Sequence, residues 1–270
     1  MIGSRAGSLK RGRLRRLASR GVRRLTLGAL LAIVALIGLL GVEAVVARLG
    51  PTERFVGPSR APRALGGTGP PLTYVVLGDS TGAGRGAPYE SGIAVATARH
   101  LALAHRIELT NLAVSGARMS DLVHGQLAAA AALRPDLVLI AAGANDVTNL
   151  TSTSSVQRDL RTLVDRLRAA HAGVRIVVTA SPDVGSARRL AQPLRWVAGW
   201  RTKQINATIA KVVAERGLTL APIAERTGPL FRKDPTLFAG DRFHPNARGY
   251  ATWTPVLNAA LDRALRARGR

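Results

Sequence analysis

Short apolar runs alternate with segments of helical spacing along the chain downstream of residue 71. The apolar runs predict strands, and the segments between them predict helices, an alternation that is typical of a parallel α/β sheet. We therefore expect a central parallel sheet of about five strands with helices on both sides. The expected strands are Thr73–Leu77, Arg106–Leu112, Leu137–Ala142, Val174–Thr179 and Leu218–Ala221.

Capping residues predict where several of the helices begin and end. Hydroxyl residues that precede leucines at helical spacing indicate helix starts at Ser120-Asp121 and near Ser154-Ser155. Gly173 is expected to end a helix over 156–170. Asn246 is expected to begin the last helix, which runs toward Arg268.

A different pattern occupies the N-terminal part of the chain. The 18 residues from Leu25 to Val42 are apolar except for one threonine and three glycines, and the run extends to Ala47 beyond Glu43. This is long enough to cross a bilayer, whereas a signal-peptide core usually spans roughly 7 to 15 residues. We expect a transmembrane signal-anchor helix over 25–47.

The charge around this run predicts its orientation. Residues 1–24 hold nine basic and no acidic residues, which predicts a cytoplasmic N-terminus and an extracytoplasmic domain. The alternative is a cleaved signal and a secreted domain, since 45–47 offers small residues and Arg23-Arg24 resembles a twin-arginine signal.

Residues 48–71 are rich in proline and glycine and lack an apolar period. They predict a partly flexible linker before a domain over 72–270, and an irregular arm packed on that domain is the alternative.

Candidate chemistry gathers where the predicted strands end. Ser80 follows the first strand in a glycine-flanked turn, and Asp241 and His244 stand three residues apart near the C-terminus. Serine becomes a good nucleophile when a base takes its proton, and a carboxylate can orient that base. The backbone of Gly116 and the side chain of Asn145 are suitable oxyanion donors. Considered alone, Gly116 is also consistent with a glycine that a backbone turn requires. Asn145 is likewise consistent with a side chain that caps a loop.

The segments Gly78-Asp79-Ser80, Gly116, Gly143-Ala144-Asn145-Asp146 and Asp241-Arg242-Phe243-His244 resemble, in order, the four blocks of the SGNH (GDSL) hydrolases. The resemblance implies a flavodoxin-like three-layer α/β/α fold and ester hydrolysis without a cofactor. It implies a Ser80-His244-Asp241 triad and an oxyanion hole of Ser80, Gly116 and Asn145. The Gly78–Gly82 stretch also fits the α/β-hydrolase elbow, but in that fold acid and base come from separate loops.

Composition limits the other classes of function. The net charge of +23 raises the hypothesis of a nucleic-acid partner. Nine of the 39 basic residues, however, precede the apolar run. The chain has ten aromatic residues and no recognition motif, so binding through base stacking has little support. The remaining basic charge fits a domain held near anionic lipid or wall polymer. The four other histidines show no metal-ligand spacing, and there is no cysteine, so neither a metal nor a disulfide is expected.

The sequence therefore predicts a membrane-anchored extracytoplasmic serine hydrolase that cleaves carboxylic esters of lipid or acylated glycan. Acyl or acetyl transfer, or deacetylation, on envelope polysaccharide is the alternative within the same chemistry. A non-catalytic envelope-binding module is a third hypothesis, against which the complete set of reactive residues argues. Oligomeric state is left open.

Overall fold

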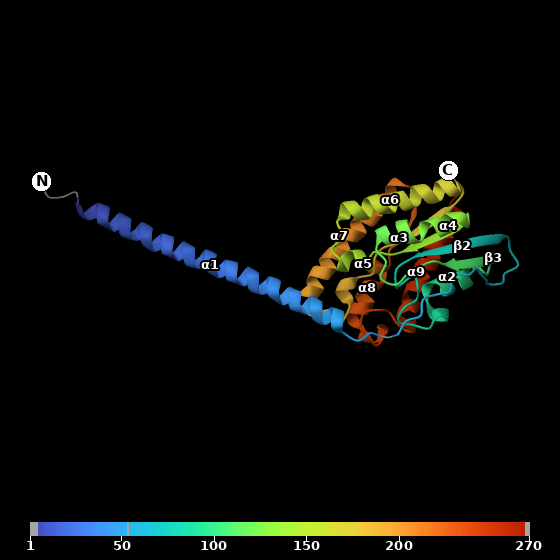
Figure 1. Cartoon of the computed structure of the whole chain (residues 1–270), viewed down its shortest axis with the longest axis horizontal. Helices are drawn as coiled ribbons and strands as arrows, with labels where there is room; N and C mark the ends of the chain where they lie inside the picture. The colour runs from blue at the N-terminus through green and yellow to red at the C-terminus, as the bar shows by residue number, and fades with distance from the viewer. Residues whose placement is uncertain (1–4, 53, 268–270) are drawn as a thin grey trace. The chain divides into compact units, whose positions relative to one another are not determined.

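The computed structural model describes residues 5–52 and 54–267, and it divides into two units, Met1–Leu49 and Gly50–Arg270. The second unit is built on a six-stranded sheet of order β1-β3-β2-β4-β5-β6. Figure 1 labels β2 and β3 of this sheet. The strands are β1 (Arg63–Ala64), β2 (Pro71–Gly78), β3 (Arg106–Asn111), β4 (Leu137–Ala141), β5 (Arg175–Thr179) and β6 (Thr219–Ala221). All pairs are parallel except β1 with β3. The predicted α/β fold is confirmed.

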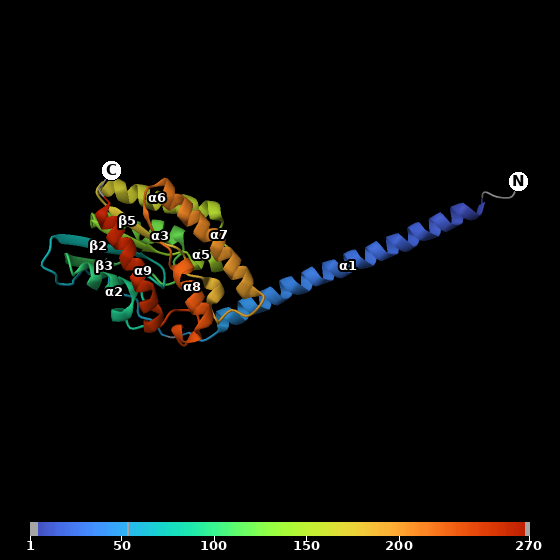
Figure 2. The same cartoon turned by 180° about the vertical axis from the view of Figure 1, so that it is seen from behind.

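Helices cover both faces of this sheet. On one face α2 and α9 lie side by side, with α8 packed against α9 (Figure 2). On the other face α6 packs against α3, α4 and α7, and α5 against α7. The helices are α2 (Ile93–Leu101), α3 (Met119–Gly125), α4 (Leu127–Ala132), α5 (Ala144–Thr148), α6 (Thr153–Ala170), α7 (Leu194–Glu215), α8 (Ile223–Lys233) and α9 (Ala247–Arg266), and single 3-10 turns lie at Tyr89–Ser91, Val184–Ser186 and Pro235–Leu237.

The two long capped helices begin close to where the sequence predicts. The hydroxyl of Ser152 accepts from the backbone N–H of Ser155 at the start of α6. Asn246 accepts from the N–H of Gly249 at the start of α9. These side chains satisfy donors that a helix leaves unpaired in its first turn. Arg268, toward which the last helix was expected to run, lies outside the described residues.

The core lies between the two helical layers. Every residue of β4 is buried, which explains why its sequence is an unbroken apolar run. All the buried apolar side chains that the structure describes lie at or beyond Leu72, in the second unit. Gly50–Arg270 thus holds a complete core.

Part of the predicted linker pairs with the sheet. The N–H of Leu65 donates to the carbonyl of Ile107, and the N–H of Arg106 donates to that of Pro70. A Cβ on Gly67 would lie 1.8 Å from the carbonyl oxygen of His105, so only glycine permits this close approach. The C-terminal end of this segment is therefore an arm packed on the domain, which was the alternative hypothesis to a flexible linker. Strand β1 was not predicted.

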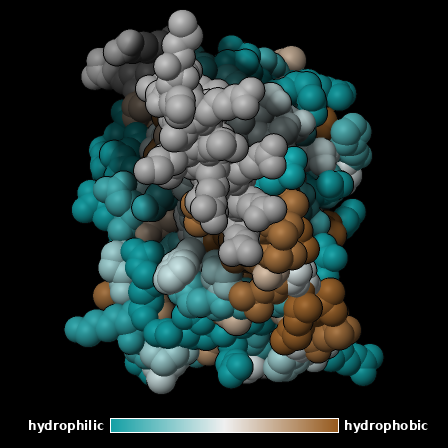
Figure 3. All heavy atoms as spheres, turned by 90° about the vertical axis from the view of Figure 1, so that its left-hand side faces the viewer, coloured by the Kyte–Doolittle hydropathy of each residue, from teal (hydrophilic) through white to brown (hydrophobic). Residues whose placement is uncertain are grey.

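The first unit is one helix, α1 (Arg5–Leu49), which joins the basic segment and the apolar run. Residues 1–4 of the basic segment lie outside the described residues. Leu25–Leu49 is long and apolar enough to span a membrane or to act as a signal sequence. Most of the large apolar side chains that are exposed among the described residues belong to α1. In space-filling view, apolar atoms form patches on an otherwise hydrophilic surface (Figure 3).

Candidate active site

Ser80 lies in a tight turn just beyond the end of β2. A Cβ on Gly78 would lie 2.2 Å from the carbonyl oxygen of Ala141 in β4, so this position requires glycine. The buried carboxylate of Asp79 accepts from the backbone N–H and the hydroxyl of Thr81, both at 2.8 Å, and thereby fixes the turn around Ser80. Ser80 is held at the carboxyl edge of the parallel strands, where ligands bind in such sheets.

The structure brings Ser80, His244 and Asp241 into one hydrogen-bonded row. Nε2 of His244 lies 2.9 Å from Oγ of Ser80, and Nδ1 lies 2.5 Å from Oδ2 of Asp241. The other oxygen of Asp241 accepts from the backbone N–H groups of Phe243 and His244, both at 2.9 Å. The side chains of Ser80, Asp241 and His244 are all buried.

The electrostatics of this row define its hydrogen-bond directions. Burial alone would raise the pKa of Asp241, but the hydrogen bonds from His244 and Phe243 outweigh it and lower the pKa to about 2. The ionised carboxylate can only accept, so Nδ1 of a neutral His244 carries the proton and donates it. Nε2 is then the acceptor for the Ser80 hydroxyl, which is the arrangement required of a general base.

A second glycine lets the segment with the histidine approach the serine turn. A Cβ on Gly86 would lie 2.4 Å from the carbonyl oxygen of Pro245 and 2.9 Å from Cβ of His244. The buried Tyr250 of α9 donates from its hydroxyl to the carbonyl of Arg85 at 2.7 Å, and this joins the same two segments again. The Ser80–His244 distance therefore depends on backbone packing on both sides.

Asn145 and Gly116 lie on neighbouring loops. Asn145 is in the first turn of α5, directly after β4, and its Nδ2 donates to the carbonyl of Ala117 at 3.1 Å. Gly116 has a φ of +91° and is exposed. The amide of Asn145 thus lies against the loop that carries Gly116. It remains a prediction that the amides of Gly116, Asn145 and Ser80 all face one oxyanion.

Asp146 braces the same region from inside the domain. Its carboxylate accepts from the N–H of Met119 at 3.0 Å, and burial raises the pKa of Asp146 to about 6, with the nearby charge of Asp79 adding to the rise. Two carboxyl groups, Asp79 and Asp146, therefore lie buried behind the loops that carry Ser80 and Asn145.

Sequence reasoning missed Gln126, a buried side chain between α3 and α4. Its amide pairs with both backbone groups of Gly78: Oε1 accepts from the N–H at 2.9 Å, and Nε2 donates to the carbonyl at 2.8 Å. A single polar residue beside the apolar run 127–133 is the only signal that the sequence offers for this role.

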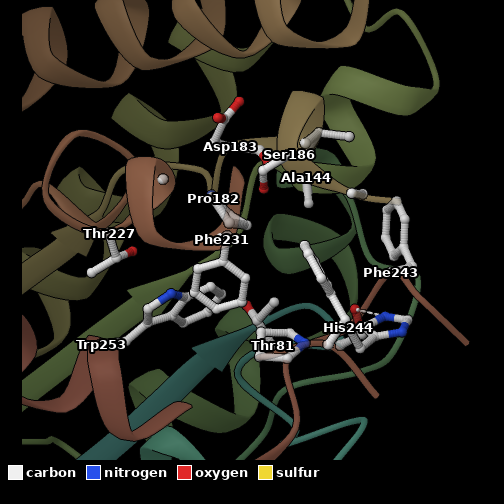
Figure 4. A pocket seen from close by; sticks show the side chains of 16 residues that line it. Thr81, Ala144, Pro182, Asp183, Ser186, Thr227, Phe231, Phe243, His244 and Trp253 are labelled. Carbon is white, nitrogen blue, oxygen red and sulfur yellow. Dashed lines mark hydrogen bonds between the residues drawn. The ribbon is translucent and has the colours of Figure 1, made fainter. Parts of the chain in front are cut away.

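A small cavity of about 40 Å³ opens beside Ser80 and His244. Its walls are mainly apolar and include four aromatic side chains (Figure 4). These are Phe231, Phe238, Phe243 and Trp253. Sequence reasoning did not single them out, since they come from three separate segments. Among the residues the structure describes, no group of three or more His, Cys, Asp or Glu could hold a metal ion.

Comparison with known proteins identifies the class to which this fold and site belong. Residues 76–252 match the model of the GDSL-like lipase/acylhydrolase family, and the chain belongs to that family. The predicted family is confirmed. The α/β-hydrolase alternative is not supported, because Ser80 follows the first of the parallel strands and Asp241 and His244 share one turn.

One sequence relative agrees with this assignment, and two solved structures share the fold. The GDSL-like esterase Rv1075c of Mycobacterium tuberculosis is 36% identical over 197 residues, which span 71% of this chain and 62% of that protein. The match thus covers less than two thirds of the relative. Phospholipase A1 from Streptomyces albidoflavus has a TM-score of 0.54 at 22% identity, over 70% of this chain and 99% of the other. The esterase EstA from Pseudoalteromonas sp. has a TM-score of 0.57 at 19% identity, over 73% and 100%.

Proposed function

We propose that this chain is a serine esterase that cleaves carboxylic esters through an acyl-enzyme on Ser80. The observation that carries the proposal is the row of hydrogen bonds from Ser80 Oγ through His244 to the ionised Asp241. Membership of the GDSL-like lipase/acylhydrolase family supports the same chemistry.

In the proposed reaction Oγ of Ser80 attacks the ester carbonyl carbon while Nε2 of His244 takes the hydroxyl proton. Asp241 stabilises the resulting imidazolium. The amides of Ser80 and Gly116 and the side chain of Asn145 stabilise the negative oxygen of the tetrahedral intermediate. The C–O bond to the alcohol then breaks, and His244 gives its proton to the leaving oxygen.

Deacylation repeats these steps with water as the nucleophile. His244, neutral again, takes a proton from water, whose oxygen attacks the acyl carbon. Collapse of the second intermediate returns the proton to Oγ of Ser80 and releases the carboxylic acid. The chain's own residues perform every step, and the proposal needs no cofactor.

Replacement of Ser80 tests this proposal directly. We expect Ser80→Ala in the full chain to lower kcat/KM for p-nitrophenyl acetate by about 10⁴-fold, because no other group forms the acyl-enzyme. The matched control is Ser154→Ala, an exposed serine of α6, which should stay within about twofold. Equal activity of the wild type and Ser80→Ala would refute the serine mechanism.

We further propose that the enzyme is anchored in the cell membrane by Leu25–Leu49 and acts outside the cytoplasm. The length and hydropathy of that segment and the nine basic residues before Leu25 support this location. Esters of lipids or acylated glycans of the cell envelope are then the substrates within its reach.

A further inference from the structure

Two indole side chains are exposed near the start of α7. Trp196 is 71% exposed and Trp200 is 59% exposed, and their spacing of four residues places them on one face of the helix. Leu150, which is 68% exposed, belongs to the same region, because Nη2 of Arg201 donates to the carbonyl of Thr151 at 2.6 Å. An apolar patch of this kind on a surface often marks an interaction site.

Positive charge accompanies the two indoles. Residues 184–214 of the sequence hold six basic and no acidic residues. The groove beside the indoles is lined by three basic side chains and two carboxylates: Arg195, Lys203, Arg232, Asp183 and Glu225. Asp183 pairs with Arg232, and the guanidinium of Arg195 donates to an uncharged oxygen, the carbonyl of Leu190. Arg195 and Lys203 against Glu225 leave a positive balance, which complements an anionic surface.

The first residues of the domain are fixed close to this segment. The guanidinium of Arg189 donates to the carbonyl of Gly50 at 3.0 Å and to that of Pro51 at 2.8 Å. The apolar segment Leu25–Leu49 ends one residue before Gly50. The chain is therefore held to the domain directly after the apolar segment and a few residues before α7. A bilayer that contains this segment is the surface within reach of the indoles.

We propose that Trp196, Trp200 and Leu150, together with Arg195 and Lys203, form a docking face that binds the surface of an anionic lipid bilayer. Indole rings favour the level of the lipid headgroups. Each basic residue near an anionic leaflet adds electrostatic attraction. The inference rests on the proposed membrane location and adds a second membrane contact, which the catalytic domain makes itself.

The docking face and the catalytic cavity share the 3-10 turn Val184–Ser186, against which α7 packs. Gly185 lines the groove beside the indoles, whereas Ser186 lines the catalytic cavity (Figure 4). The start of α7 also lies at the carboxyl edge of the sheet, where Ser80 is held. Docking therefore brings the catalytic cavity close to esters of membrane lipids.

Vesicle binding of Gly50–Arg270, which holds the complete core and lacks the apolar segment, tests the docking face directly. Co-sedimentation with phosphatidylglycerol vesicles should exceed that with phosphatidylcholine vesicles and should weaken as salt is added. Trp196→Ala combined with Trp200→Ala should lower the partition coefficient at least about tenfold, and Lys203→Gln about fivefold. Leu103→Ala, at an apolar side chain that is 83% exposed beyond α2, is the matched control and should stay within about twofold.

Equal partition of the wild type and the double indole variant would overturn the inference. Binding of Gly50–Arg270 to envelope polysaccharide, with none to the vesicles, would also overturn it and would assign the indoles to a glycan. Hydrolysis of p-nitrophenyl acetate by the double variant should stay within about twofold of the wild type, because Trp196 and Trp200 do not line the catalytic cavity.

Tryptophan fluorescence measures docking in the full chain. The sequence has three tryptophans, of which the third, Trp253, is buried. In phosphatidylglycerol vesicles that contain brominated lipid, the emission of the wild type should be quenched more than that of the variant with Trp196→Ala and Trp200→Ala, which keeps only Trp253. Equal quenching would refute docking and leave the anchor intact. A full chain that does not enter the vesicles would refute the anchor, and hydrolysis that survives Ser80→Ala would refute the serine mechanism.

Discussion

The side-chain amide of Asn145 carries two hydrogens, and the carbonyl of Ala117 takes one of them. That bond fixes the orientation of the amide and leaves the second hydrogen available for a substrate oxygen. A donor that is oriented before the reaction stabilises the developing negative charge without further reorganisation. Asn145 is therefore suited to a role that appears in the transition state more than in substrate binding.

We expect Asn145→Ala to lower kcat by about 10²- to 10³-fold with little change in KM. Asn149→Ala is the control, because Asn149 carries the same amide at an exposed position of the same segment. Steady-state kinetics with one ester and both variants measure the difference. A loss in Asn145→Ala no larger than that in Asn149→Ala would exclude an oxyanion role.

Asp146 makes the folded domain sensitive to pH. Its pKa is about 6 in the folded state against about 3.9 in an unfolded chain, so ionisation is less favourable when folded. The penalty is absent below about pH 4, grows as the pH rises from 4 to 6, and is complete above 6. At about 1.4 kcal/mol per pKa unit, it amounts to roughly 2 to 3 kcal/mol at neutral pH.

Asp146→Asn removes this titration. The unfolding free energy of wild-type Gly50–Arg270 should fall relative to Asp146→Asn by up to about 2 to 3 kcal/mol between pH 4 and pH 7. Urea unfolding of both proteins across this range measures it. Asp121→Asn, at an exposed carboxylate, serves as the control. A difference between wild type and Asp146→Asn that is constant with pH would contradict the buried titration.

Sequence motifs predict candidate residues whose chemistry is local, and not residues whose role depends on folding. Ser80, Asp241 and His244 stand in short segments with recognisable neighbours. Gln126 does not, because its role arises from a contact with a distant segment, the backbone of Gly78. A single glutamine beside an apolar run carries no such information.

At the scale of elements, the strands were predicted best. All five expected strands agree with β2 to β6 within about two residues, because each is an apolar run between loops. β1 was missed because two exposed residues among prolines and glycines show no alternation, and its pairing is set by the edge of β3.

The junction between β2 and the α3–α4 pair supports a prediction on stability. Gln126→Leu keeps the volume but leaves the buried N–H of Gly78 without its acceptor. The carbonyl of Gly78 retains the N–H of Val114 at 3.0 Å, so the main loss comes from one donor. We expect a loss of about 1 to 3 kcal/mol in the unfolding free energy of Gly50–Arg270.

Gln157→Leu, a partly exposed glutamine of α6, provides the comparison and should change the unfolding free energy by less than about 0.5 kcal/mol. Because Gly78 lies two residues before Ser80, Gln126→Leu should also lower kcat. Chemical denaturation and ester kinetics on both variants check these expectations. A Gln126→Leu domain as stable as the control would show that the pairing contributes little.

At the scale of the whole molecule, the chain combines a domain with a complete core and an apolar helix that has hardly any buried side chain. An exposed apolar surface of this length is unfavourable in water and favourable in a bilayer. The sequence pattern alone indicates this division, since the apolar run, the proline-rich stretch and the alternating α/β pattern differ in composition. The position of the arm within 50–71 could not be predicted, because it depends on the edge of the folded sheet.

The membrane anchor is tested by fractionation of cells that express the enzyme. The full chain should remain in the membrane pellet after alkaline carbonate extraction, because transfer of Leu25–Leu49 into water is unfavourable. Gly50–Arg270 should stay in the supernatant. A chain with Leu31→Arg and Leu36→Arg should be inserted poorly, since each arginine at the centre of a span costs about 2.5 to 3.5 kcal/mol on insertion scales.

Mass spectrometry of the membrane-bound protein separates the anchor from a cleaved signal. An uncleaved anchor retains the full mass of 28.4 kDa, whereas cleavage near Ala47 removes the entire basic and apolar segment. Protease added outside intact spheroplasts should digest the esterase domain if the basic N-terminus stays in the cytoplasm. Release of a shortened, active enzyme into the medium would contradict the anchor and leave the esterase mechanism intact.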